Sequence, residues 1–258
     1  MKTQNKVVLV TGAAVRIGAI IAKTLHQRGY HIILHYNGSA SAAMALCQQL
    51  NNQREDSVVA LQGDFTCKKQ LRTLAQRAVK AWGTLYGLVN NAALFFPDGS
   101  PSVLKEQQDL LMACNVTAPL LLSEWLAPAL KKQQGAIVNI GDIHGSKPLK
   151  GYKTYSASQA ALLAITENLA CSLAPHIRVN AVSPGPTLPP TGENALSETQ
   201  YFDLQQKTLL ERFTDPADVA QSVIFCLENN SLTGHNLVLD GGRRLKSSAE
   251  KNKKEDIF

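Results

Sequence analysis

The stretch KVVLVTGAAVRIGAIIAKTLHQRG (residues 6–29) combines three signals that together predict the fold. Residues 6–11 are apolar and rich in valine, as in a strand that is covered on both faces of a parallel sheet. Gly12 and Gly18 lie in the turn that follows, and a helical pattern runs through residues 16–29. Glycines at a strand-to-helix turn let the backbone approach a pyrophosphate, which then sits at the helix N-terminus. We therefore predict the start of a dinucleotide-binding domain; a tight turn without a ligand is the alternative.

The rest of the chain repeats this alternation of apolar runs and helical patterns. Further strands are expected at 31–36, 57–62, 86–91, 135–140, 177–182 and 236–240. Helices are expected at 39–51, 67–82, 102–132, 153–174 and 215–229. The pattern predicts an α/β fold, a Rossmann-like doubly wound parallel sheet of about seven strands with helices on both faces. We expect a single domain over residues 1–245 and a charged, mobile tail over residues 246–258.

Composition bounds the possible functions. Of the 258 residues 45% are hydrophobic, and the net charge is +6. No apolar run approaches the roughly 20 residues of a membrane span, and the first apolar stretch is too short for a signal peptide, so we expect a cytoplasmic protein. Five dispersed cysteines argue against a disulfide framework and against a bound metal. No basic stripe is interleaved with aromatics, so nucleic acid is not an expected partner.

The end of the second expected strand, LHYNGSA (34–40), indicates the cofactor. NAD-binding proteins commonly place a carboxylate here on the adenosine ribose, and this stretch has none. Its candidate cofactor contacts are His35, Tyr36, Asn37 and Ser39. A missing carboxylate permits a 2′-phosphate, so we predict NADP(H). Asp64, after the third strand, can reach the adenine edge or cap a helix. Arg16 stands where such loops often carry glycine and can contact a phosphate or an anionic substrate.

One long irregular stretch, SPGPTLPPTGENALSETQ (183–200), follows the sixth expected strand. Such a loop in a compact domain is often a lid or a binding loop, although a plain surface loop is the alternative. It leaves the carboxyl end of its strand, where open α/β sheets bind ligands.

Over about residues 5–245 the chain resembles the short-chain dehydrogenase/reductase family. The matching segments are TGAAVRIG (11–18), GDF (63–65), NNAA (90–93), Asn115 in NVTAP, AIVNI (136–140), Tyr155, IRVNAVSPGP (177–186) and LTGHNLVLDGG (232–242). The resemblance implies further cofactor contacts from Ile17, Phe65, Asn91, Ala92, Pro184 and Gly185. It also implies a homotetramer that uses the long helices at 102–132 and 153–174 as interfaces.

Several details resemble the pteridine reductase branch of this family. They are Arg16, the His-Tyr pair in LHYNGSA, the aromatic residues in NNAALFFP (90–97), Asp142 where most of the family has serine, and GGRRL (241–245). This resemblance implies a pterin or folate-like substrate. Phe95 would stack on its ring opposite the nicotinamide, and Arg16 would face the substrate or a cofactor phosphate. A core position for Phe95 is the alternative.

The family motif Tyr-x-x-x-Lys reads here as Tyr155-Ser-Ala-Ser-Gln159. In the family the tyrosine exchanges a proton with the substrate, while the lysine binds the nicotinamide ribose and lowers the tyrosine pKa. Gln159 can bind the ribose but carries no charge. An ionised Asp142 would raise the pKa of Tyr155 and keep it protonated. These residues suit a one-way reduction in which Tyr155 is the acid and Asp142 relays protons.

Two supporting roles have alternatives. Asn115 holds a water of the proton relay, or else it bridges a helix to the backbone. Asp142 serves the relay, or it caps a helix or loop. A substitute cation from Lys147, Lys150 or Lys153 is conceivable, but Lys153 lies two residues before Tyr155 and points elsewhere on a helix.

The sequence predicts an NADPH-dependent reductase that adds hydride to a C=N bond of a pteridine or dihydrofolate-type ring. Two alternatives stay open. The first is a catalytically impaired NADP(H)-binding or regulatory protein that has lost the lysine. The second is a ketone reductase of the same fold, against which Asp142 argues, because a carboxylate cannot donate a hydrogen bond unless it is protonated.

Overall fold

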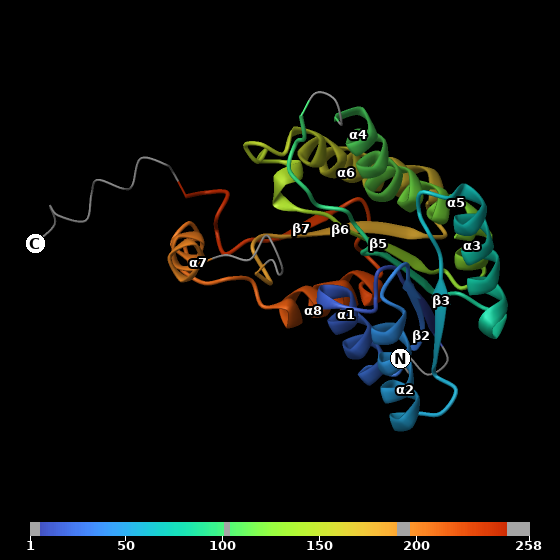
Figure 1. Cartoon of the computed structure of the whole chain (residues 1–258). Coiled ribbons are helices and arrows are strands. Elements are labelled where there is room, and N and C mark those ends of the chain that lie inside the picture. The colour runs from blue at the N-terminus through green and yellow to red at the C-terminus, as the bar shows by residue number, and fades with distance from the viewer. Residues whose placement is uncertain (1–5, 101–103, 190–196, 247–258) are drawn as a thin grey trace, which may run out of the picture.

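The structure is a computed structural model that describes residues 6–100, 104–189 and 197–246 (Figure 1). Its centre is a seven-stranded sheet of order β3-β2-β1-β4-β5-β6-β7, in which every neighbouring pair is parallel. The strands are β1 (Val7–Val10), β2 (His31–Tyr36), β3 (Val58–Gln62), β4 (Gly87–Asn90), β5 (Ala136–Ile140), β6 (Arg178–Pro184) and β7 (Asn236–Leu239). The predicted Rossmann-like α/β sheet is confirmed.

Helices connect the strands much as the sequence predicted. They are α1 (Arg16–Gln27), α2 (Ala40–Gln53), α3 (Lys68–Trp82), α4 (Leu104–Met112), α5 (Ala118–Lys132), α6 (Lys153–Leu173), α7 (Glu198–Gln205) and α8 (Pro216–Glu228). A π-helical turn, Ala113–Thr117, joins α4 to α5 where one uninterrupted helix was expected. Helix α7 lies in and just beyond the expected loop, of which residues 190–196 lie outside the described residues.

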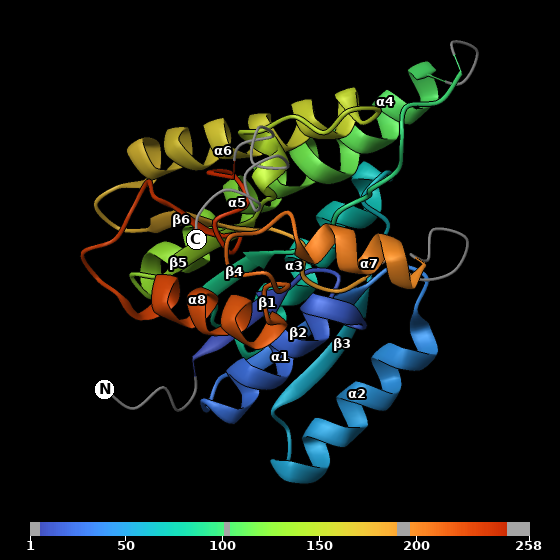
Figure 2. The ribbon, with the colours of Figure 1, turned by 90° about the vertical axis from the view of Figure 1, so that its left-hand side faces the viewer.

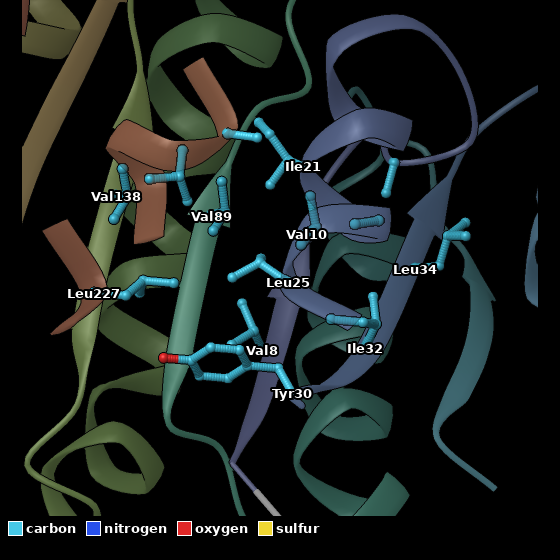
Figure 3. Close-up of a cluster of buried hydrophobic side chains, with 14 of the residues drawn as sticks. Val8, Val10, Ile21, Leu25, Tyr30, Ile32, Leu34, Val89, Val138 and Leu227 are labelled. Atoms are coloured by element: carbon cyan, nitrogen blue, oxygen red, sulfur yellow. The ribbon is translucent and has the colours of Figure 1, made fainter. Parts of the chain in front are cut away.

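The helices form two layers around the sheet (Figures 1 and 2). Helices α1, α2 and α8 cover one face, and α3, α5 and α6 cover the other. Alternation along β1 explains the division, because Val8 and Val10 pack toward α1 whereas Val7 and Leu9 pack toward the opposite face. Figure 3 shows Val8 and Val10 beside Leu25 of α1.

The chain reverses its direction of winding at β1, which lies between β2 and β4. In an open α/β sheet the connections diverge at this point and leave a crevice beyond the carboxyl ends of the strands. Val10 of β1 pairs with Val89 of β4, so the turn that begins at Thr11 faces the segment after Asn90. The cofactor motifs of the sequence therefore converge at this crevice.

One helix has the length and composition of a membrane span. It runs over Lys105–Lys132, and its most apolar window has a mean hydropathy of 1.4, with half of that window buried. Leu122, Leu126 and Leu130 are completely buried against the sheet, as in the core helix of a globular domain. The helix is therefore weak evidence for a membrane. The expected tail lies outside the described residues except for Lys246, whose ammonium donates to the carbonyls of Gln206 and Thr208.

Candidate active site

The glycine turn after β1 is fixed to the segment after β4. The Thr11 hydroxyl accepts from the backbone N–H groups of Asn91 and Ala92, both at 2.9 Å. The Asn91 amide donates in turn to the Thr11 carbonyl at 2.8 Å. Gly12 has φ +62°, and a Cβ atom on Gly18 would lie 2.2 Å from the Gly12 carbonyl oxygen. Gly12 and Gly18 thus permit a tight turn in which the backbone, without side chains at these two positions, faces the crevice.

His35 supports this turn from beneath. Gly12 N–H donates to Nδ1 at 3.1 Å, so Nε2 carries the proton that it donates to the Gly63 carbonyl at 2.9 Å. The ring stacks on Phe65 with centroids 4.5 Å apart, and only 2% of the residue is exposed. Burial lowers the pKa of His35 to about 4, so the imidazole is neutral. His35, which lies in β2, therefore joins the loops after β1 and β3.

A cavity of about 360 Å³ occupies the crevice. The predicted cofactor residues that line it are Gly12, Arg16, Ile17, Gly18, His35, Asn37, Asp64, Phe65, Asn91 and Ala92. Six further residues line the cavity and were not predicted as cofactor contacts: Val15, Gly63, Thr66, Ala93, Leu94 and Cys114. Val15 lies within TGAAVRIG and Gly63 within GDF, and Cys114 directly precedes Asn115. Their positions next to predicted residues could therefore have indicated them as cavity residues.

The other four predicted cofactor residues do not line this cavity. Tyr36 is 8% exposed at the end of β2, and Ser39 is the N-cap residue of α2 with no capping bond from its side chain. Pro184 ends β6. A Cβ atom on Gly185 would lie 2.9 Å from the Cα of Asp240, so glycine here permits close packing against the turn after β7.

Asp64 and Arg16 make contacts within the protein. Asp64 Oδ1 accepts from the backbone N–H and the hydroxyl of Thr66, both at 2.8 Å, which closes a turn before α3. Asp64 is not the N-cap of α3, because that position is Cys67. Arg16 has φ +53°, and its guanidinium donates to the carbonyls of Leu188 at 3.1 Å and Pro189 at 3.3 Å. Those two residues line a second cavity of about 830 Å³. Arg16 therefore separates the two cavities and fixes the loop after β6.

Tyr155 lies in α6 and is hydrogen-bonded to Asp142. Its hydroxyl donates to Asp142 Oδ2 at 2.8 Å, while Oδ1 accepts from His144 N–H at 2.8 Å and caps the 3₁₀ turn Ile143–Gly145. Both expected roles of Asp142, cap and tyrosine partner, thus coexist. Burial is the main cause that raises the pKa of Tyr155 well above its usual value, and the charge and hydrogen bond of Asp142 raise it further. The phenol is protonated at neutral pH.

Phe95 forms a flat apolar wall next to this pair. It is 50% exposed, so it is not a core aromatic. Its ring meets the Tyr155 ring edge-on, with centroids 4.7 Å apart and an interplanar angle of 85°. The other neighbour is Tyr152, stacked at 4.7 Å and 11°, which the sequence analysis missed. A half-exposed aromatic ring beside a phenolic proton suits a planar ligand.

Asn115 lies in the π-helical turn and is 1% exposed. Its Oδ1 accepts from Leu94 N–H at 2.8 Å, and its Nδ2 donates to the Leu94 carbonyl at 2.9 Å and to the Ser158 hydroxyl at 3.1 Å. The bridging alternative thus describes its side chain. Asn115 fixes the loop that carries Phe95 against the helix that carries Tyr155. Single π-helical turns are frequent at functional sites.

Gln159 lies one turn after Tyr155 in α6 and is 2% exposed. Its Oε1 is buried without a hydrogen-bond partner among the described residues. Buried polar atoms are nearly always paired, so this oxygen indicates a missing donor such as a ligand hydroxyl. Lys153 offers no substitute charge, because its side chain is 82% exposed and its ammonium lies 4.0 Å from Asp98. The unpaired oxygen and the glycine cradle fit a nicotinamide dinucleotide.

The switch-point crevice, the glycine turn and the Tyr155–Gln159 pair define the class of dinucleotide-binding α/β proteins. Within this class, the chain belongs to the short-chain dehydrogenase/reductase family. The sequence profile described as enoyl-(acyl carrier protein) reductase matches residues 12–244.

Similar proteins include pteridine reductase 1 of Leishmania tarentolae, which is 32% identical over 93% of this chain and 96% of the relative. The 3-oxoacyl-[acyl-carrier-protein] reductase FabG of Staphylococcus epidermidis is 30% identical over 92% of this chain and 98% of the relative. The crystal structure of FolM alternative dihydrofolate reductase 1 from Brucella canis, complexed with NADP, has a TM-score of 0.89 at 32% identity. The match with this crystal structure covers 97% of the present chain and 98% of the chain in the crystal structure. The resemblance to the pteridine reductase branch is confirmed.

Proposed function

We propose that this protein is an NADPH-dependent reductase of a pteridine or dihydrofolate-type ring. The observation that carries the proposal is the protonated Tyr155, hydrogen-bonded to Asp142 and in edge-on contact with the half-exposed ring of Phe95. The likeness to a pteridine reductase and to an NADP-bound dihydrofolate reductase supports it.

The chain's own residues would hold the cofactor. Gly12 and Gly18 leave room for the pyrophosphate at the start of α1, and Gln159 Oε1 would accept from a ribose hydroxyl. Asn37 lines the adenosine end, and residues 34–40 bring no carboxylate to it, so a 2′-phosphate meets no like charge there. When bound, NADPH supplies the hydride that reduces the C=N bond.

Tyr155 would supply the matching proton. In the reduction the nitrogen of the C=N bond takes the proton from the Tyr155 hydroxyl, so a phenolate forms next to the Asp142 carboxylate. Two adjacent negative charges oppose each other, and solvent protons relayed along Asp142 restore the phenol. Without a cation from position 159, oxidation of the product has little phenolate base available at neutral pH. We therefore expect a reductase that runs mainly in one direction.

Two other functions compete with this proposal. The likeness to a 3-oxoacyl reductase favours a ketone substrate, but Asp142 Oδ2 accepts a hydrogen bond where the family serine would donate one to a carbonyl oxygen. A protein that binds the cofactor without catalysis agrees with the unpaired Gln159 oxygen, because a hydroxyl of the bound ribose alone would supply its hydrogen bond. Neither alternative explains why a half-exposed aromatic ring, Phe95, lies beside Tyr155.

We further propose a homotetramer, with α4, α5 and α6 as its interfaces. Leu110 and Met112 on α4 support this because they are 41% and 38% exposed. Cytoplasmic location stays a prediction.

The deciding experiment measures NADPH consumption with dihydrobiopterin, dihydromonapterin and dihydrofolate in parallel, and with an acetoacetyl thioester as the ketone. We expect turnover with at least one of the three heterocycles. Y155F should lower kcat by roughly 10²- to 10⁴-fold, as loss of a general acid does, with unchanged NADPH affinity. Y152F, which keeps the ring stacked on Phe95, is the matched control. Faster reduction of the thioester would transfer the proposal to ketones, and binding of NADPH without any turnover would favour the non-catalytic role.

A further inference from the structure

The turn after β7 places Arg243 at the same edge of the sheet as Asp142. The chain turns through Gly241 and Gly242, with φ +59° and +79°. The Asp240 carboxylate closes the turn, because Oδ1 accepts from Gly242 N–H at 2.9 Å and Oδ2 accepts from Arg244 N–H at 2.8 Å. Arg243 N–H donates to the Asp240 carbonyl at 3.0 Å. The backbone of Arg243 is therefore firmly held.

The topology brings Arg243 toward the tyrosine site. Asp142 follows β5 and Arg243 follows β7, and only β6 lies between them in the sheet. Because all three strands are parallel, their carboxyl ends open on one edge. Arg243 thus belongs to the rim on which Tyr155 and Asp142 meet.

The charge of Arg243 is not neutralised in the described part of the chain. Both Asp240 oxygens already accept from backbone N–H groups, and no carboxylate of the described residues forms an ion pair with Arg243. Its Nη1 is buried without a hydrogen-bond partner among the residues that the structure describes. Burial lowers the pKa of this guanidinium, whereas the charges of Asp142 and Asp240 act to raise it. A partly buried cation with an unpaired, buried nitrogen is costly for stability, so its presence on this rim points to a functional role.

We propose that Arg243 is a positioning residue of this active site, whose charge acts through Asp142 on Tyr155 and replaces the cation that Gln159 lacks. The inference rests on the proposed function. When the Tyr155 proton passes to the ring nitrogen, a negative charge develops on the phenol oxygen beside the Asp142 carboxylate. A cation near that carboxylate offsets the repulsion, so that the carboxylate keeps accepting the Tyr155 hydrogen bond.

The first test compares R243Q, R243K and R244Q with the parent enzyme. Arg244 is the matched control because it lies in the same turn and is exposed. R243Q should lower kcat about 10- to 100-fold. This decrease is smaller than the one expected when a hydrogen-bond donor that directly contacts the reacting atoms is removed. The KM of the heterocycle and the dissociation constant of NADPH should change less than about threefold, because Arg243 is expected to act in the transition state and not on the binding of substrate or cofactor. R243K should recover most of the lost kcat, and R244Q should resemble the parent.

Three results would overturn the proposal: a raised KM at constant kcat, which would make Arg243 a substrate anchor; no recovery in R243K; or an equal loss in R244Q. A double-mutant cycle with D142N then tests whether Arg243 acts through Asp142. In the D142N background, R243Q should change kcat less than about threefold, because coupled residues are not additive.

The same cycle measured by urea unfolding needs no substrate. Non-additive effects of D142N and R243Q on the unfolding free energy would support the Arg243–Asp142 coupling even if no heterocycle is reduced, whereas additive effects would refute it. Failure of the proposed function and failure of this inference are therefore distinguishable.

Discussion

At the scale of single residues, the site differs from the family motif mainly in Gln159. A lysine at this position would place a charge about 4 Å from the phenol, which is worth roughly 4 kcal/mol, or about three pKa units, at an effective dielectric near 20. Gln159 exerts no such effect. Tyr155, whose pKa burial and Asp142 raise, thus keeps its proton over the whole physiological range.

Q159K should therefore change the pH profile rather than create activity. The new ammonium lowers the pKa of Tyr155, so reduction should lose rate at a lower pH than in the parent, once the phenol begins to ionise. Oxidation of the product should gain as the phenol ionises, because phenolate becomes available. The measurement is kcat in both directions from about pH 6 to about pH 10.

Q159M, which has a similar length but no charge, is the control and should show neither change. If the parent has no measurable turnover and Q159K is an active reductase, the protein is a cofactor-binding member that lost its chemistry.

Local spacing explains which of these residues could be found from the sequence. Tyr155 and Gln159 stand one helical turn apart in a recognisable motif, and Asp142 follows a strand at a fixed distance before them. Tyr152 carried no such signal, and Arg243 lies in the segment GGRRL, whose spacing does not indicate a role in the site. Their roles depend on the fold, which packs Phe95 on Tyr152 and places the turn after β7 two strands from the end of β5.

At the scale of elements, the expected strands and the expected helices were both predicted with bounds close to those of the structure. The buried strands of a parallel sheet are continuous apolar runs, so their bounds were found to within about two residues. Helix α7 was missed because none of its residues is buried, which leaves no apolar stripe to detect. Its capping box was readable, since Ser197 and Gln200 have the required spacing and make both reciprocal hydrogen bonds. The π-helical turn within the expected long helix has no sequence signature.

The strand–turn–helix unit of β1 and α1 yields a prediction about close packing. G18A should abolish NADPH binding and cost several kcal/mol of stability, because the new Cβ would lie 2.2 Å from a backbone oxygen and 2.5 Å from the Asn91 amide nitrogen. Urea unfolding and fluorescence titration with NADPH measure the two effects.

G38A is the control for the same chemical change. A Cβ atom at Gly38 meets nothing within 4 Å, and the residue lies outside the left-handed region. Its stability should therefore stay within about 0.5 kcal/mol of the parent, as for other surface substitutions. Comparable losses in G18A and G38A would mean that the turn after β1 is looser than its packing indicates.

At the scale of the whole molecule, acid stability depends on histidines that are buried in neutral form. The pKa of His35 is lowered to about 4 by burial, and that of His26 to about 4 by burial and then by Arg54 and His31. An unfolded chain protonates histidine near pH 6.5. Between about pH 6.5 and pH 4 the unfolded state therefore binds more protons than the folded state, and stability falls as pH falls.

H35N should reduce this pH dependence. Asparagine offers Gly12 N–H an acceptor but does not titrate, and it loses the bond to Gly63 and the stack on Phe65. At pH 7 we expect the variant to lose about 1–2 kcal/mol of unfolding free energy. His35 contributes up to about 3 kcal/mol to the loss between about pH 6.5 and pH 4, so the curve of H35N should be flatter by about that amount.

Urea unfolding of the cofactor-free protein at several pH values between about 4.5 and 7 measures this difference. H235N is the control, because His235 is exposed and should leave the slope as it is in the parent. His26 stays in both variants, so a residual acid loss is expected even in H35N. A slope in H35N as steep as in the parent would mean that the imidazole beneath the glycine turn becomes protonated while the chain is still folded. The loops after β1 and β3 would then separate before the sheet unfolds, and NADPH affinity would fall with pH ahead of stability.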